Sequence, residues 1–153
     1  MSEPGWERFR AELAAELETL ADETAVADEI AVVVDVAQAL GPTAVQAQKS
    51  WLSRLRPKRT EGGHPYVQFA ANDETLRMEV SSNEFLAPQH QLDQGAVGIL
   101  ERLGWSPPNA IESPNFFIDR PLAQAPELVG IAVQTLSEVF GVTDAAALQI
   151  RRV

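Results

Sequence analysis

Few residues in this sequence have the chemistry for catalysis or metal binding. The chain has 153 residues, with two histidines, His64 and His90, and no cysteine. A zinc site would therefore have to rest on carboxylates with at most two imidazoles, and neither HExxH nor a comparable spacing is present. Each histidine is better explained as a loop residue, so we expect no metal and no cofactor.

Phosphate binding and general acid–base catalysis have no better support. Gly62 and Gly63 lack the lysine, the serine and the strand-to-helix setting of a P-loop, and no GxGxxG occurs. Nothing in the sequence places two of the carboxylates Glu79, Glu84 and Asp93 at the separation that acid–base catalysis needs. We therefore expect that the protein is not an enzyme.

Charge is distributed unevenly along the chain. The formal net charge is −10, yet five of the twelve basic residues fall within residues 49–59. An acidic body repels nucleic acid and acidic membranes, which leaves this stretch as the element suited to face an anion. We favour the ordinary alternative, a solvated surface that offsets nearby carboxylates.

The composition is that of a globular protein, with 45% hydrophobic and 22% charged residues. No segment has the unbroken apolar run of about 18 residues that a membrane span needs. The first residues show neither a basic leader nor an apolar core, and the lack of cysteine fits a reducing compartment, so we expect a cytoplasmic protein. At this length the default is one domain over residues 1–153, with residues 37–63 as a basic insert.

An alternating stretch over residues 65–86 predicts a β-hairpin. Its inward, apolar set is Val67, Phe69, Leu76, Met78 and Val80. Asn72 and Asp73 tolerate the left-handed backbone of tight turns, which puts the tip at residues 71–74. A lone hairpin is barely stable in water, so helices or further strands must cover its apolar face.

The remaining elements follow from periodicity and end signals. Helices are predicted over residues 3–21 with Ser2 as N-cap, 43–56, 92 or 93 to 103 with Gly104 as C-cap, and 126–140. Residues 30–36 predict a strand because they are rich in β-branched side chains, although residues 25–40 also fit an apolar helix. Pro88 ends the second arm of the hairpin, and residues 115–122 predict another strand.

Several linked pieces of the sequence resemble a known family. They are Trp6 and Phe9 on the first helix, YVQFA and LRMEVSSNEFL in the hairpin, QLD at 91–93, LGW at 103–105 before Pro107 and Pro108, PNFF at 114–117, and TLSEVFGV at 135–142. In this order they resemble the actinobacterial domains described as similar to type III secretion chaperones and YbjN proteins. These are often called TY-Chap domains and are proposed to bind peptides. Residues 37–63 depart from the family, being longer and more basic than expected between the first two strands.

The resemblance implies an α+β fold of the type III secretion chaperone-like, YbjN-like kind. In it an N-terminal helix precedes an antiparallel sheet, and helices pack on one face of that sheet; the patterns above indicate the same arrangement. The resemblance also implies a secretion-chaperone-like or adaptor protein. Such a protein binds an extended or helical segment of a partner without catalysis, through exposed apolar surface or an unpaired sheet edge.

Residues that do not fit the core pattern predict a peptide-binding surface on the outward face and edge of the sheet. The set is Tyr66, Gln68, Arg77 and Glu79 in the hairpin and Phe117 on the later strand. The ordinary alternative is cross-strand pairing, with Arg77 bound to a carboxylate and Tyr66 shielding a rim. A symmetric homodimer could also cover the aromatic patch.

Two functions from different classes remain open. The first is a peptide- or protein-binding module whose partner the sequence does not identify. The second is a regulator whose basic residues 49–59 contact nucleic acid or another polyanion. Salt separates them, because anion binding weakens steeply as salt rises whereas apolar peptide capture hardly changes.

Overall fold

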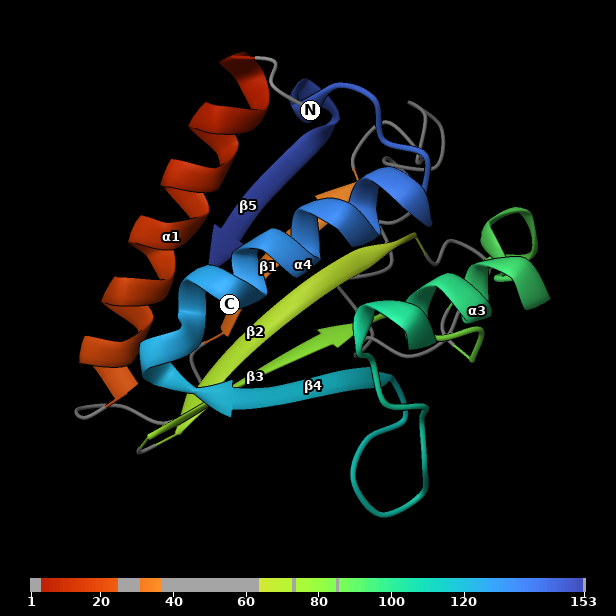
Figure 1. Ribbon diagram of the computed structural model, residues 1–153, viewed down its shortest axis with the longest axis horizontal. Coiled ribbons are helices and arrows are strands. Elements are labelled where there is room, and N and C mark those ends of the chain that lie inside the picture. The colour runs from red at the N-terminus through yellow and green to blue at the C-terminus, as the bar shows by residue number, and fades with distance from the viewer. Residues whose placement is uncertain (1–3, 25–30, 37–63, 73, 85, 153) are drawn as a thin grey trace, which may run out of the picture.

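The computed structural model describes residues 4–24, 31–36, 64–72, 74–84 and 86–152. Its framework is an antiparallel sheet with the strand order β4-β3-β2-β1-β5. Helices α1 and α4 lie over one face of the sheet, and α3 lies beside α4 (Figure 1). We call that face the inner face and the opposite one the outer face. The fold is α+β, as the sequence predicted.

In chain order the elements are α1 (Pro4–Thr24), β1 (Ala31–Val36), β2 (Tyr66–Asn72), β3 (Thr75–Val80), η2 (Pro88–His90), α3 (Gln94–Leu103), β4 (Phe116–Pro121), η3 (Leu122–Gln124), α4 (Ala125–Glu138), η4 (Ala145–Ala147) and β5 (Leu148–Arg152). The elements labelled η are short 3-10 helices.

The β2–β3 hairpin forms with the predicted alternation. The inward residues Val67, Phe69, Leu76, Met78 and Val80 are all completely buried on the inner face. Asn72 pairs with Thr75, so the two strands meet within the predicted tip. The second arm is shorter than predicted, since β3 ends at Val80 and not near Pro88. The Ser81 N–H donates to the Tyr66 carbonyl. Because β2 begins at Tyr66, the residues after Ser81 have no β2 residue opposite them.

β1 decides the open choice for residues 30–36 in favour of a strand. It lies between β2 and β5, and Val34 is opposite both Val67 and Ile150. Strands flank β1 on both sides, and its side chains are also buried on both faces, with Val32 and Val34 inside and Val33 and Asp35 outside. Ile30, the predicted helix at 43–56 and the whole of residues 37–63 lie outside the described residues.

α1 follows the predicted pattern and continues to Thr24, beyond the predicted end at Ala21. Its buried stripe is Trp6, Phe9, Leu13, Leu17 and Leu20, which recur at helical spacing. The Trp6 and Phe9 rings meet edge to face with their centroids 5.9 Å apart. The predicted N-cap, Ser2, lies outside the described residues.

The two later helices are where the sequence placed them. α3 begins after Asp93, whose Oδ1 accepts the Ala96 N–H at 2.8 Å, and ends at Gly104, whose φ of +108° favours glycine. Among its predicted inward residues only Leu100 is fully buried; Ala96, Ile99 and Leu103 are partly exposed. α3 therefore lies at the border of the core.

α4 is largely buried, as predicted. Its buried residues are Leu128, Val129, Ala132, Val133, Thr135 and Leu136. The Thr135 hydroxyl accepts the indole N–H of Trp105 at 3.0 Å, which ties the segment after α3 to α4.

The final strand, β5, was missed by the sequence analysis. Its five residues contain two apolar positions, Leu148 and Ile150, and three polar ones, which is too short a pattern to distinguish from a loop. It becomes a strand by pairing with β1, far away in the sequence. β4, in contrast, is close to the predicted 115–122, and Phe116 and Ile118 face the core as expected.

We predict that Phe69→Ala lowers the free energy of unfolding by about 3–5 kcal/mol, because it leaves a cavity at a fully buried site in the centre of the core. Chemical denaturation measures this change. Gln68→Ala, one position away on the outer face, is the matched control and should change stability by less than about 1 kcal/mol. A similar loss in both variants would contradict the assignment of faces.

Candidate functional site

The five predicted binding residues all lie on the outer face. Gln68 on β2 is opposite Glu79 on β3, and Glu79 is opposite Phe117 on β4, so these three side chains form one row across three strands. Arg77 and Tyr66 flank this row on the same face, since they alternate with the buried inner residues. The structure thus brings the whole set together on the side of the sheet away from α1 and α4.

Arg77 is the centre of the first cluster on this face. Its Nε and Nη2 donate to the two carboxylate oxygens of Asp119, its cross-strand partner, at 2.8 Å each. Nη1 donates to the Glu112 carbonyl at 2.9 Å and Nη2 to the Glu112 carboxylate at 3.0 Å. The guanidinium also stacks over Phe117, 4.6 Å from the ring centroid. These hydrogen bonds, chiefly those with Asp119, raise the pKa of Arg77 and lower that of Asp119.

Asn115 is the centre of the second cluster and is almost completely buried, with 5% of its surface exposed. Its Nδ2 donates to the Tyr66 hydroxyl at 3.2 Å and to Glu79 Oε1 at 3.0 Å, and its Oδ1 accepts the Ser82 N–H at 3.2 Å. Both ends of the amide are therefore used. The side chain fixes the positions of two of the predicted binding residues.

Asp35 on β1 forms the third cluster. Its carboxylate accepts hydrogen bonds from His64 Nε2 at 2.7 Å and from Arg151 Nε. Burial by itself would raise the pKa of Asp35, but the two hydrogen bonds and the Arg151 charge outweigh it, so the pKa is lowered. His64 was predicted as a loop residue. It does precede β2 outside any helix or strand, and its ring lies against the Asp35 carboxylate of β1.

The segment between α3 and β4 borders the outer face as an ordered loop. Ser106 and Phe117 exchange backbone hydrogen bonds, and Asn109 and Ser113 do the same. The Asn109 side chain accepts the N–H groups of Ile111 and Glu112, which fixes the loop tip. Ile111 at that tip is 90% exposed.

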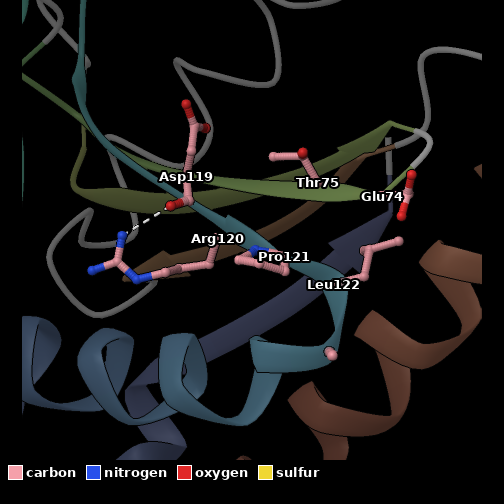
Figure 2. A pocket seen from close by; sticks show the side chains of 7 residues that line it. Glu74, Thr75, Asp119, Arg120, Pro121 and Leu122 are labelled. Carbon is pink, nitrogen blue, oxygen red and sulfur yellow. Dashed lines mark hydrogen bonds between the residues drawn. The ribbon is translucent and has the colours of Figure 1, made fainter.

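An open hollow of about 610 Å³ lies where β3 begins and β4 ends. Figure 2 shows it bounded by Glu74 and Thr75 on one side and by residues 119–123 on the other. Within it Arg120 Nη1 donates to the Asp119 carbonyl at 2.8 Å (dashed in Figure 2). None of the five predicted residues lines this hollow.

In the part of the chain that the structure describes, no three His, Cys, Asp or Glu side chains gather as a metal site. Over the same residues, no helix combines the length and apolarity that crossing a bilayer requires. What the outer face offers is hydrogen bonding, charge and an aromatic ring held in fixed positions, which suits recognition.

Sequence reasoning missed most of the residues that hold this face in place. Asp35 was predicted only as part of a strand, and Asn115 only as the first residue of the strand at 115–122 and as part of the PNFF motif. A carboxylate partner for Arg77 was anticipated, and the structure identifies it as Asp119 with a second, Glu112. The sequence analysis predicted no register of β3 on β4; the observed register places Asp119 opposite Arg77.

A helix-covered antiparallel sheet with an N-terminal helix and a polar, ordered outer face is the α+β arrangement consistent with type III secretion chaperone-like proteins. The chain belongs to the TY-Chap3 family: the family model described as "T3SS (YopN, CesT) and YbjN peptide-binding chaperone 3" matches residues 2–153. This confirms the resemblance and supports a general chaperone-like binding role. Comparisons with curated proteins and with solved structures gave no match.

We predict that Tyr66 titrates above the ordinary value of 10.0 in the folded protein. Burial is the main cause, and the charges of Glu79 and Asp35 raise the pKa further, against the hydrogen bond from Asn115. Tyr66 is the only tyrosine, so ultraviolet absorbance follows its ionisation directly. The midpoint should fall to the ordinary value in denaturant and should move down in Glu79→Gln. A folded-state midpoint at or below 10.0 would refute the buried placement of the phenol.

We predict that the stabilising effect of the Asp35 charge depends on pH. The pKa of Asp35 is lowered on folding. The ionised carboxylate therefore stabilises the folded state at pH values above its ordinary pKa of 3.8, and this stabilisation is lost as the pH falls through the lowered, folded-state pKa. Asp35→Asn removes the charge. Urea denaturation should therefore show a larger difference from wild type near pH 6 than near pH 3, and an equal difference at both would contradict this prediction.

Proposed function

We propose that this protein is a non-catalytic peptide- or protein-binding module, secretion-chaperone-like or adaptor in type, that uses the outer face. The proposed contact residues are Tyr66, Gln68, Arg77, Glu79 and Phe117. The partner is a protein or peptide segment, and the compartment is the cytoplasm. A homodimer through the same face is the competing use of these residues.

The observation that carries the proposal is the fixed row Gln68–Glu79–Phe117 with Arg77 stacked on the ring. Asn115 holds Glu79 and Asp119 holds Arg77, so these two side chains have little freedom left to lose when a ligand binds. Aromatic residues, phenylalanine included, and arginine are also among the residue types enriched in protein interfaces. The family membership supports the same general role.

The alternative function rests on basic residues 49–59, which lie outside the described residues, so no structural observation favours it. Salt dependence separates the two: binding through the outer face should survive moderate salt, whereas polyanion binding should weaken steeply.

The proposal is tested with a phage-displayed library of random peptides of about twelve residues, selected on the immobilised protein. We expect enriched peptides whose affinity falls at least ~10-fold in Phe117→Asp, because the substitution removes the ring and puts a carboxylate next to Glu79. The matched control is Ala11→Asp, which adds the same charge on the exposed side of α1. Denaturation curves check that both variants fold.

Light scattering at several concentrations separates a ligand surface from a self-association surface. A dimer that persists on dilution and is broken by Phe117→Asp would assign the face to self-association. If Phe117→Asp is folded and monomeric and binds the selected peptides with unchanged affinity, the outer face is not the site.

A further inference from the structure

The two edges of the sheet differ in whether they can accept another strand. At the β4 edge, the Phe117 N–H donates to the Ser106 carbonyl at 3.1 Å, and the Phe117 carbonyl accepts the Ser106 N–H at 2.9 Å. The Asp119 carbonyl accepts Arg120 Nη1, and Pro121 has no N–H to offer. These are the devices by which proteins protect exposed sheet edges against strand addition. Most of the outward backbone groups of β4 are therefore blocked.

The β5 edge has a different arrangement. In an antiparallel ladder, alternate residues direct their N–H and carbonyl toward the partner strand. The Val36 N–H donates to Pro65 on the β2 side, so Val33 and Asp35 bond to β5, opposite Arg151 and Gln149. Ile150 therefore directs both backbone groups away from β1.

No partner for those groups is present among the described residues. Ile150 takes part in no backbone hydrogen bond outside the β1–β5 ladder. The Leu148 N–H, one step along the same edge, is used by the Ala145 carbonyl, but its own carbonyl also faces outward. Within the described residues, the Leu148 carbonyl and the N–H and carbonyl of Ile150 are thus the unpaired backbone groups identified along this edge.

The side chains along β5 define what would fit beside it. On the inner face Leu148 and Ile150 are partly buried and pack against the core. On the outer face Gln149 is exposed and the Arg151 side chain is 50% exposed. Arg151 donates to Asp35 through Nε, and its two terminal nitrogens, which make no hydrogen bond among the described residues, can bind a carboxylate. Glu16 of α1 binds Arg152 at 2.8 Å, so α1 runs alongside this strand (Figure 1).

We propose that the β5 edge, centred on Ile150, binds an extended peptide segment as a further strand, with apolar residues toward Ile150 and acidic residues toward Arg151. This site rests on the proposed peptide-binding function and adds to it the backbone contact and the alternating chemistry of the ligand. Main-chain hydrogen bonds supply the attraction in such strand addition, and alternate side chains supply the selectivity.

Two synthetic peptides test the site: acetyl-Glu-Val-Glu-Val-Glu-amide and the matched acetyl-Lys-Val-Lys-Val-Lys-amide, titrated into isotope-labelled protein. NMR should show the glutamate peptide shifting the Ile150 amide signal and slowing its hydrogen exchange by ~10-fold or more, with binding of the lysine peptide at least ~10-fold weaker. Equal binding of the two peptides would overturn the charge assignment. No change at Ile150 with either peptide would overturn the site.

Backbone methylation of the peptide makes the test independent of protein variants. In this register one valine sits opposite Ile150 and the other opposite Leu148, and both direct their N–H groups to β5, so N-methylation of both valines should abolish binding. N-methylation of the central glutamate, whose N–H faces solvent, should leave it intact. Equal effects at both positions would exclude strand addition.

A proline variant of the protein extends the test to the edge itself. Ile150→Pro removes an outward N–H without breaking a ladder bond, whereas the control Ile150→Val keeps that N–H. Only Ile150→Pro should prevent peptide binding, and unchanged binding in a folded Ile150→Pro variant would contradict the site. If library peptides bind the outer face while Ile150 is unaffected, the edge proposal fails and the proposed function stands. If no library peptide binds, the proposed function itself fails.

Discussion

The burial of alternate residues of the β2–β3 hairpin under α1 and α4 is the constraint on which the rest of the structure depends. Side chains on a strand alternate between faces, so committing Phe69 and Met78 to the core commits Gln68, Arg77 and Glu79 to the other side. The helices then cover a single face. The residues of the candidate site lie on the opposite face, which the helices leave uncovered.

That outer face is held together by hydrogen bonds and ion pairs where the inner face is held by apolar packing. Asp35 and Asn115 are buried polar side chains, and each makes several hydrogen bonds, as the cost of an unpaired buried group demands. The same bonds fix the orientation of Tyr66 and Glu79. A ligand would meet a surface that is already arranged, which favours a defined contact over an adaptable one.

The fold could be predicted largely from local pattern, and the site only in part. The alternation of β2 and β3 and the capping residues Asp93 and Gly104 are signals contained in short segments, and the structure agrees with them. β5 could not be predicted, because its strand character comes from pairing with β1. The same holds for the contacts of Asp35 and Asn115, whose partners are brought near by the register of distant strands. That the five outward residues share a face follows from the alternation of side chains within each strand, which is a local pattern. Their hydrogen-bond partners come from distant segments and could be identified only from the tertiary fold.

The central position of β1 has a consequence for synthesis of the chain. β1 is the first strand along the sequence, yet one of its two neighbours, β5, is the last, and Asp35 and Arg151 are 116 positions apart. At the usual ~5–20 residues per second, the ribosome needs roughly 6–23 seconds to add that length. Throughout that interval the edge of β1 that later pairs with β5 has no β5 beside it, and Asp35 has no ion pair with Arg151. The nascent chain must therefore keep an aggregation-prone strand out of contact with its neighbours until its last partner emerges.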